Sequence, residues 1–216
     1  MGHVPHCFVP GPWDGERLTP AEAAARHLER VLRLAPGSDL TYTDGAGTVG
    51  AGKWRPPHID RGVEQRLPDE PRVTIAVAPP KSTERQRFLV EKLAELGVAR
   101  LVWLAARYGD GRPPRPEKAR AWAVGALEQS RGAWLLDIGG PVDVADLPVG
   151  AVLADRDGPS VGAGAVPDTI AIGPAGGWHP DELAIASRTI SLGERILRTE
   201  TAAIAAAVHA LAARGA

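Results

Sequence analysis

The sequence contains a single cysteine, Cys7, and aromatic residues make up only 5% of its 216 positions. One cysteine excludes an internal disulfide, and no group of cysteines and histidines has the spacing of a structural zinc site. Long apolar runs are also absent: none approaches the roughly 18 residues of a membrane-spanning helix, and residues 1–12 lack the continuous apolar stretch of a signal peptide. We therefore expect a soluble, cytoplasmic protein without a metal.

An excess of charge of either sign is lacking as well. The chain has 25 lysines and arginines against 26 acidic residues, which gives a formal net charge of −1. Because this balance is not typical of a nucleic-acid binder, any RNA site must be a local basic patch. The apolar content of 44% is sufficient for one large domain, or for a small domain joined to a medium-sized one.

The first part of the chain, residues 1–70, predicts a small β-rich module. One helix is expected over residues 21–34, after Thr19 as its N-cap. Two β-like runs flank a glycine-containing turn with hairpin chemistry, and they cover residues 39–43 and 48–54. Residues 56–71 are polar and lack clear periodicity, so we place the domain boundary there, with a second domain over 71–216.

The second part of the chain alternates strands with helices, which is the pattern of a parallel sheet covered on both faces. The expected strands are residues 73–78, 101–106, 151–154, 169–172 and 189–192. The expected helices are residues 83–96, 116–130, 180–187 and 199–213. We therefore predict an α/β fold for this domain.

The loops after residues 172 and 192 are the main candidates for a site, because ligands of such sheets bind at the carboxyl ends of the strands. The first loop, from Gly173 to Trp178, begins with three glycines and a proline in five residues. That composition lets the backbone approach a ligand closely, although a tight structural turn explains it about equally well. The loop is neither a Walker loop nor a dinucleotide fingerprint, which disfavours phosphate binding.

The second loop leads into a helix that is apolar almost all round, and such a helix is normally buried in a domain or a subunit interface. A capped core helix, with Thr199 as N-cap and Glu200 near the positive end of the helix dipole, explains part of this segment. It does not explain Arg195 and Arg198, two arginines three residues apart.

These two loops resemble the paired carboxyl-terminal motifs of the 16S ribosomal RNA uridine N3-methyltransferases, a SPOUT family. The matching strings are Gly-Pro-x-Gly-Gly from Gly173 and Leu-Gly-x-Arg-Ile-Leu-Arg-x-Glu-Thr-Ala from Leu192. Residues 91–98 are similar to the first helix of the family's methyltransferase domain, and residues 128–130, Glu-Gln-Ser, match a further motif. Residues 27–34 are similar to the family's PUA-like RNA-binding domain, so the matches span most of the chain in the family's order.

The resemblance implies a SPOUT trefoil-knotted, parallel-sheet methyltransferase domain preceded by a small PUA-like β-barrel. It also implies S-adenosylmethionine as cofactor, 16S rRNA of the small ribosomal subunit as substrate, and a homodimer. Carried over residue by residue, the cofactor-binding positions are Ile172, Gly173, Pro174, Gly176, Gly177, Leu192, Gly193, Ile196 and Leu197.

The resemblance also places Arg198 and Glu200 nearest the reaction. Arg198 is expected to stabilise negative charge on the uracil oxygens. Glu200 is a candidate base, but a carboxylate at a helix start is more often a cap or the partner of an arginine. The residues expected to contact RNA are Arg30, Arg33, Lys81, Arg85 and Arg87. A further basic group surrounds a proline-rich loop and consists of Arg107, Arg112, Arg115, Lys118 and Arg120; taken alone, each basic patch is more often a solvated surface.

The chain departs from the family pattern at Ala175, where the family usually has glutamate, and at Arg131-Gly132, where glycine and arginine are transposed. Two alternatives therefore stay open: a SPOUT methyltransferase for another RNA site, and a protein that binds RNA or cofactor with weak or lost turnover. A small-molecule α/β enzyme that uses another nucleotide is a third alternative. It would require a phosphate-binding lysine motif, which the sequence lacks.

Overall fold

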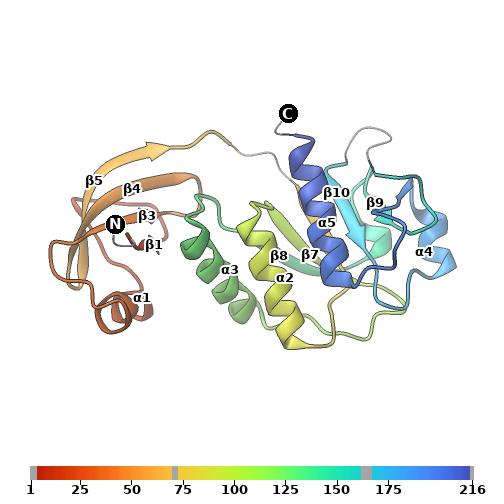
Figure 1. The fold of residues 1–216 in the computed structure, drawn as a ribbon, viewed down its shortest axis with the longest axis horizontal. Helices are drawn as coiled ribbons and strands as arrows, with labels where there is room; N and C mark the ends of the chain where they lie inside the picture. Colours follow the sequence, from red (N-terminus) through yellow and green to blue (C-terminus); the bar gives the residue numbers. More distant parts are fainter. Residues whose placement is uncertain (1–3, 70–72, 162–166, 215–216) are drawn as a thin grey trace. The chain divides into compact units, whose positions relative to one another are not determined.

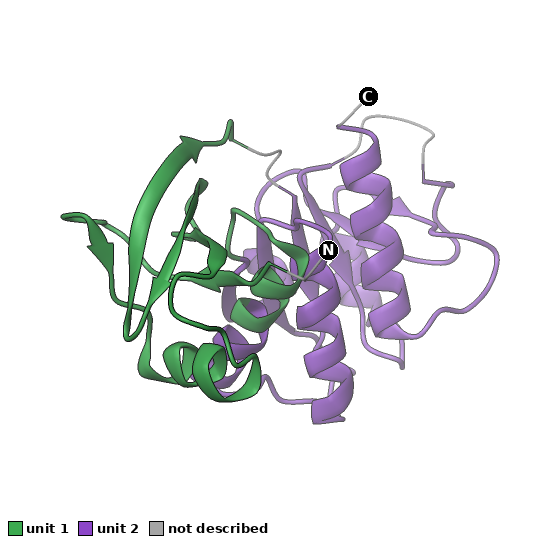
Figure 2. Ribbon diagram, turned by 60° about the vertical axis from the view of Figure 1, so that its left-hand side comes forward, with its two compact units in different colours: residues 1–69, 124–135 green, residues 70–123, 136–216 purple. Residues whose placement is uncertain are grey.

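A computed structural model describes residues 4–69, 73–161 and 167–214 of the chain. These residues form two compact units: the first contains residues 1–69 and 124–135, and the second contains residues 70–123 and 136–216 (Figure 2). The boundary expected at residues 70 and 71 lies outside the described residues. No pattern in the sequence indicates that residues 124–135 return to the first unit.

Backbone and side-chain hydrogen bonds explain why residues 124–135 belong to the first unit. The Gly47 N–H donates to the Ala133 carbonyl over 2.9 Å, and the Leu135 N–H donates to the Gly45 carbonyl over 2.8 Å. The Glu128 carboxylate accepts the Phe8 N–H over 2.9 Å. Burial raises the pKa of Glu128, and the bond from Phe8 partly opposes that shift.

The first unit is built on a five-stranded sheet with the order β1-β3-β4-β5-β2. Its strands are β1 (His6–Phe8), β2 (Arg17–Leu18), β3 (Asp39–Thr43), β4 (Thr48–Arg55) and β5 (His58–Arg66). The hairpin predicted over residues 39–54 is confirmed as the antiparallel pair β3–β4. Residues 58–66, which lie in the segment without clear periodicity, form β5, and this strand pairs with both β4 and β2. Ile59 is its only fully buried side chain, so no hydrophobic alternation marks this strand.

The helix predicted over residues 21–34 is shorter than expected, and its second half is π-helical instead of α-helical. It consists of α1 (Glu22–Arg26) and a π-helical turn, η1 (His27–Val31), whose buried residue is Leu28. The predicted N-cap is wrong: Ala21 occupies that position, and the Thr19 hydroxyl lies 3.2 Å from Nδ1 of His58 instead.

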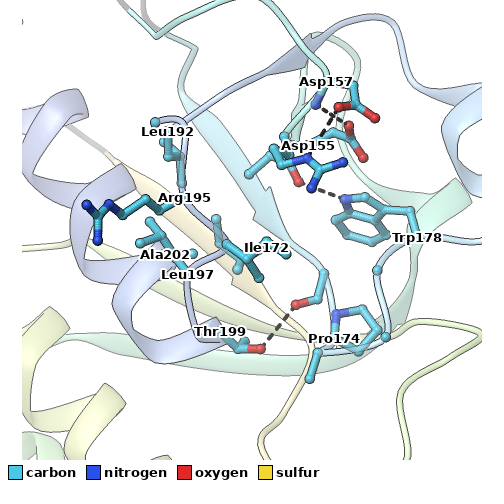
Figure 3. Close-up of a pocket in the computed structure, with 18 residues that line it drawn as sticks. Asp155, Asp157, Ile172, Pro174, Trp178, Leu192, Arg195, Leu197, Thr199 and Ala202 are labelled. Atoms are coloured by element: carbon cyan, nitrogen blue, oxygen red, sulfur yellow. Dashed lines mark hydrogen bonds and ion pairs between the residues drawn. The ribbon is translucent and has the colours of Figure 1, made fainter.

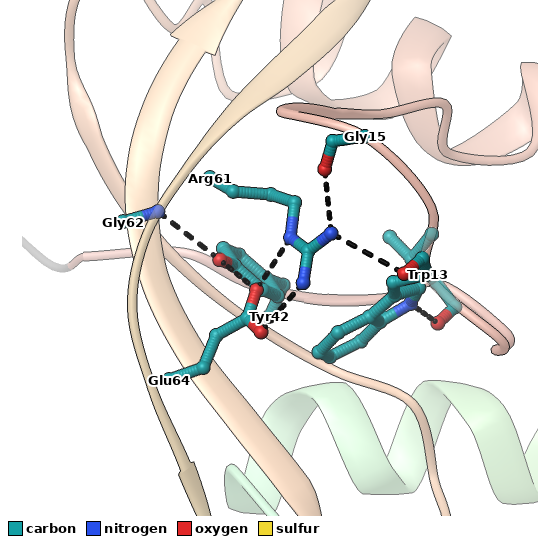
Figure 4. Close-up of polar contacts among 7 residues, drawn as sticks. Trp13, Gly15, Tyr42, Arg61, Gly62 and Glu64 are labelled. Carbon is teal, nitrogen blue, oxygen red and sulfur yellow. Dashed lines mark hydrogen bonds and ion pairs between the residues drawn. The ribbon is translucent and has the colours of Figure 1, made fainter.

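A polar network joins β5 to the loop that precedes β2 (Figure 4). The Arg61 guanidinium donates to both carboxylate oxygens of Glu64, over 2.7 and 2.8 Å, and also donates to the Gly15 carbonyl over 2.6 Å. The hydroxyl of Tyr42, a fully buried residue, donates to the same carboxylate over 2.8 Å. The hydrogen bonds from Arg61 are the main reason that the pKa of Glu64 lies below its usual value.

We expect Glu64→Gln to lower the free energy of unfolding by about 1–3 kcal/mol at neutral pH, because a two-point hydrogen bond to a charged group is lost. A carboxyl with a lowered folded-state pKa contributes stability above its unfolded pKa and loses it as the pH falls through the folded pKa. The difference between wild type and variant should therefore shrink below about pH 4. Urea unfolding across this pH range measures the difference in the free energy of unfolding.

Asp60→Asn, which affects ion pairs at the exposed side chains of Arg17 and Arg55, is the matched control and should change stability by less than about 1 kcal/mol. If the stability difference between the wild type and Glu64→Gln does not change with pH, the carboxyl of Glu64 does not have a lowered pKa in the folded protein.

The second unit contains a six-stranded sheet with the order β11-β9-β10-β6-β7-β8, and all of its pairs are parallel. Its strands are β6 (Thr74–Val77), β7 (Arg100–Ala105), β8 (Asp137–Asp143), β9 (Val152–Ala154), β10 (Thr169–Ile172) and β11 (Thr189–Ile190). The five predicted strands are confirmed within a residue or two at their ends. Strand β8 escaped prediction because it is an exposed edge strand that contains Gly139, Gly140 and Pro141.

The predicted helices are α2 (Thr83–Glu95), α3 (Pro116–Ser130), α4 (Pro180–Ile185) and α5 (Thr199–Ala212), close to their predicted bounds. Residues 124–130 of α3 belong to the first unit. A short 3₁₀ turn, η2 (Val144–Asp146), precedes β9. Helices α2 and α5 lie side by side on one face of the sheet (Figure 1). The predicted architecture, a parallel α/β sheet with a small β-rich module, is confirmed. In the described part of the chain, no helix has the length and apolar character to cross a membrane.

Candidate functional site

A pocket of about 430 Å³ lies at the carboxyl ends of three adjacent strands, β10, β9 and β11 (Figure 3). Its walls are the loops that follow these strands, at residues 173–178, 155–157 and 192–197, together with the first turn of α5. The carboxyl ends of parallel strands meet at one edge of a sheet, so loops that are far apart in the sequence come together there.

Both predicted loops contribute to this one pocket. The nine residues that the sequence analysis assigned to a cofactor all line it: Ile172, Gly173, Pro174, Gly176, Gly177, Leu192, Gly193, Ile196 and Leu197. The two residues assigned to catalysis, Arg198 and Glu200, are not part of the lining. Arg198 is an exposed residue between Leu197 and Thr199, which do line the pocket.

The conformation of the first loop requires glycine at two positions. Gly177 has a φ of +78°, in the left-handed region that side chains disfavour. A Cβ atom at Gly173 would lie 2.9 Å from the indole of Trp178. That indole is only 7% exposed, and its N–H donates to the Ala154 carbonyl over 2.9 Å (Figure 3). Trp178 therefore fastens the glycine loop to the end of β9 and forms one side of the pocket.

A second hydrogen bond joins the glycine loop to α5. The Thr199 hydroxyl donates to the Gly173 carbonyl over 3.3 Å (Figure 3). The prediction of Thr199 as N-cap is wrong, because Arg198 occupies that position with extended backbone angles and Thr199 is the first residue of the helix. The hydroxyl therefore bridges the two predicted motifs and does not cap the helix.

Glu200 is buried and lies opposite Arg85 of α2. Their Oε1 and Nε atoms are 3.7 Å apart, and the Glu200 side chain is 10% exposed. A carboxylate that faces an arginine across two packed helices acts as its ion-pair partner, so the geometry favours this role for Glu200 over that of a base. Both residues are candidates from the sequence alone, but no sequence pattern indicates that they pair.

The remaining basic residues predicted to contact RNA are distributed over both units. In the second unit, Lys81 forms an ion pair with Asp110, and Arg87 pairs with Glu91 over 2.7 Å. In the first unit, Arg30 is an exposed residue of η1, and Arg33 follows that turn with a φ of +50°. None of these four residues lines the pocket.

The structure adds pocket residues that were not predicted: Ala154, Asp155, Arg156, Asp157, Ala175, Trp178, Arg195, Thr199 and Ala202. The turn after β9 is ordered by the Asp155 carboxylate, which accepts the Asp157 N–H over 2.8 Å, and Arg156 lies 3.4 Å from Asp157. The signal for this loop was present in the sequence, because Asp-Arg-Asp-Gly follows a predicted strand at the same edge of the sheet.

The described residues contain no group of three or more histidine, cysteine, aspartate or glutamate side chains that could hold a metal ion. The pocket is instead lined by apolar side chains, glycine backbone and charges of both signs. Such a lining can accept a ligand with an apolar ring and several polar substituents.

A family model described as an RNA methyltransferase domain matches residues 68–156 and 159–211. Ribosomal RNA small subunit methyltransferase E from Synechocystis is 30% identical over 86% of this chain and 69% of its own length. The protein of that name from Mycobacterium bovis is 31% identical, over 83% of this chain and 80% of its own length. The crystal structure of the Neisseria gonorrhoeae protein of that name, bound to S-adenosyl methionine, has a TM-score of 0.82 at 23% identity and covers 95% of this chain and 96% of its own. This chain therefore belongs to the ribosomal RNA small subunit methyltransferase E family and is an rRNA methyltransferase.

Proposed function

We propose that this protein transfers the methyl group of S-adenosylmethionine to N3 of a uridine in the 16S rRNA of the small ribosomal subunit. The observation that carries the proposal is a pocket at the carboxyl edge of the parallel sheet that is lined by both of the motifs that resemble this family. Family membership supports the reaction class.

The residues of the pocket fit S-adenosylmethionine. Ile172, Leu192 and Leu197 offer apolar contact for adenine, and the glycine loops offer backbone N–H and C=O groups. Asp155 and Arg195 carry charges opposite to those of the ligand's ammonium and carboxylate groups. When bound, the cofactor supplies an electrophilic methyl group on a sulfonium.

The chain's own residues then have to position the uracil and favour its N3 anion. Uracil N3 holds its proton at neutral pH, so a cation near the ring oxygens lowers the barrier by stabilising the charge that develops there. Arg198 suits this role because it is exposed at the rim, between two pocket-lining residues. Holding N3 in line with the methyl group supplies the remaining acceleration. We assign Glu200 to pairing with Arg85, with general-base catalysis as the alternative role.

We further propose a cytoplasmic homodimer. The exposed large apolar side chains of the second unit include Phe88 on α2 at 44%, Ile196 on the pocket loop at 83%, and Val208 on α5 at 47%. A second copy of the chain that covered them would remove apolar surface from water. Arg30, Arg33, Lys81, Arg85 and Arg87 are proposed as contacts to the rRNA.

Calorimetric titration of S-adenosylmethionine into the protein, followed by methyl transfer to undermethylated small ribosomal subunits, tests this function. Binding together with N3-methyluridine in the 16S rRNA is the expected result. Binding without transfer would support the second candidate, a protein with another RNA target or with weak turnover, which the departure at Ala175 favours. The absence of cofactor binding would refute the proposal.

We expect Thr199→Val to weaken the binding of S-adenosylmethionine by about threefold to tenfold. The substitution keeps the side-chain shape but removes the hydrogen bond to the Gly173 carbonyl, and such a bond contributes about 1 kcal/mol. Thr199→Ser keeps the hydroxyl and is the matched control. If both variants bind the cofactor with the same affinity, the hydroxyl does not hold the two pocket loops together.

A further inference from the structure

A second cavity of the α/β unit is a groove of about 1060 Å³ along the loop that joins β7 to α3. Its lining carries four cationic side chains, Lys81, Arg112, Arg115 and Lys118, and two acidic ones, Asp110 and Glu117. The whole chain has a net charge of −1, so this groove is a local cationic site on a protein without an overall positive charge.

The groove is held in shape by buried and backbone contacts. The Gln86 side chain is 3% exposed, and its amide donates to the Pro80 carbonyl over 2.6 Å and to the Arg112 carbonyl over 2.8 Å. A Cβ atom at Gly111 would lie 1.9 Å from the Pro79 carbonyl oxygen, so only glycine permits this approach of the two loops. Because these contacts fix the loop before binding, the entropic cost of ordering it on a ligand is low.

Two of the four cations are available to a ligand. Lys81 forms an ion pair with Asp110, and Lys118 lies 5.4 Å from the centre of the Trp122 ring. Arg112 and Arg115 are exposed, and among the residues that the structure describes no carboxylate lies within 4.0 Å of either guanidinium. Guanidinium groups of this kind suit phosphate oxygens, which they contact with two parallel hydrogen bonds.

The same loop reaches the cofactor pocket at its other end. A Cβ atom at Gly176, which lines that pocket, would lie 3.5 Å from the Cβ of Tyr108. The buried Glu182 carboxylate fixes this end of the loop, because it accepts the backbone N–H groups of Arg107 and His179, each over 2.8 Å. A polymeric ligand bound along the groove would therefore reach the edge of the cofactor pocket.

From this geometry we propose that the groove between Lys81 and Lys118 binds the phosphodiester backbone of the substrate RNA, with Arg112 and Arg115 as its main phosphate contacts. This inference rests on the proposed function, and it names the part of the protein that holds the RNA next to the methyl donor. It differs from the predicted contacts Arg85 and Arg87, whose guanidinium groups face Glu200 and Glu91.

The double variant Arg112→Ala/Arg115→Ala tests the inference. We expect its affinity for in-vitro-transcribed 16S rRNA to fall by about tenfold or more at 0.1 M salt, and the slope of log Kd against log salt to decrease by about 1.5–2, since two phosphate contacts are lost. Its KM for small subunits should rise, and its affinity for S-adenosylmethionine should stay that of the wild type. Arg112→Lys/Arg115→Lys should retain most of the salt dependence, because the charges remain.

Arg100→Ala is the matched control, because this exposed arginine lies at the amino end of β7, away from the carboxyl-end loops, and pairs with Asp137. It should change neither RNA affinity nor the salt slope. If the double variant has the same RNA affinity and salt slope as the wild type, the inference is wrong, whether or not methylation proceeds. If the double variant loses RNA affinity but the wild-type protein does not bind S-adenosylmethionine, the groove is supported and the proposed function is refuted.

Discussion

Replacement of Arg198 by alanine is expected to lower kcat for methylation of small ribosomal subunits by about 10²–10³-fold, which is the usual cost of removing one group that stabilises a developing oxyanion. The Kd for S-adenosylmethionine should stay unchanged, because Arg198 does not line the pocket. Helix α5 should also remain intact, since the Arg198 side chain makes no capping hydrogen bond. Single-turnover methylation and calorimetry measure the two quantities.

The pH profile separates this role from a structural one. If Arg198 stabilises the N3 anion, the deficit of Arg198→Ala should become smaller as the pH rises toward the pKa of the uracil, because the anion then forms without help. Arg198→Lys retains the positive charge and should recover part of kcat. A deficit that is independent of pH, or one that appears only as weaker cofactor binding, would contradict the assignment.

Replacement of Trp178 by alanine is expected to lower the free energy of unfolding by about 3–5 kcal/mol and to abolish measurable binding of S-adenosylmethionine. Trp178 belongs to the same buried cluster as Ala76, Ala78 and Leu153, and it forms one pocket wall. Its loss leaves a cavity and frees the glycine loop from the Ala154 carbonyl. Urea unfolding followed by circular dichroism measures the stability.

Trp178→Phe distinguishes packing from hydrogen bonding. It retains an aromatic ring in the core but removes the N–H donor, so we expect a loss of about 1–2 kcal/mol and a cofactor affinity between those of the wild type and the alanine variant. If Trp178→Ala unfolds like the wild type, the indole does not support the pocket.

Local sequence signals were sufficient for much of the fold. The hairpin β3–β4 follows from its glycine-containing turn, and the alternation of apolar runs with helical periods gives five of the six strands of the parallel sheet. These local signals did not predict the strands that bury few side chains. Strand β5 has one fully buried side chain, and β8 lies at a sheet edge with two glycines and a proline. Neither strand has the alternation on which a sequence-based prediction depends.

The pocket, like the fold, has features that the sequence predicts and features that only the tertiary structure shows. By itself the sequence determined that two glycine-containing loops follow strands of a parallel sheet, and their residues meet because the carboxyl ends of such strands share an edge. Only the tertiary structure decided which groups meet: the Thr199 hydroxyl and the Gly173 carbonyl, the Glu200 and Arg85 side chains, and the Gln86 amide and the Arg112 carbonyl. The members of each pair are at least 26 residues apart. Their meeting depends on how helices and loops pack on the sheet, and no local propensity encodes it.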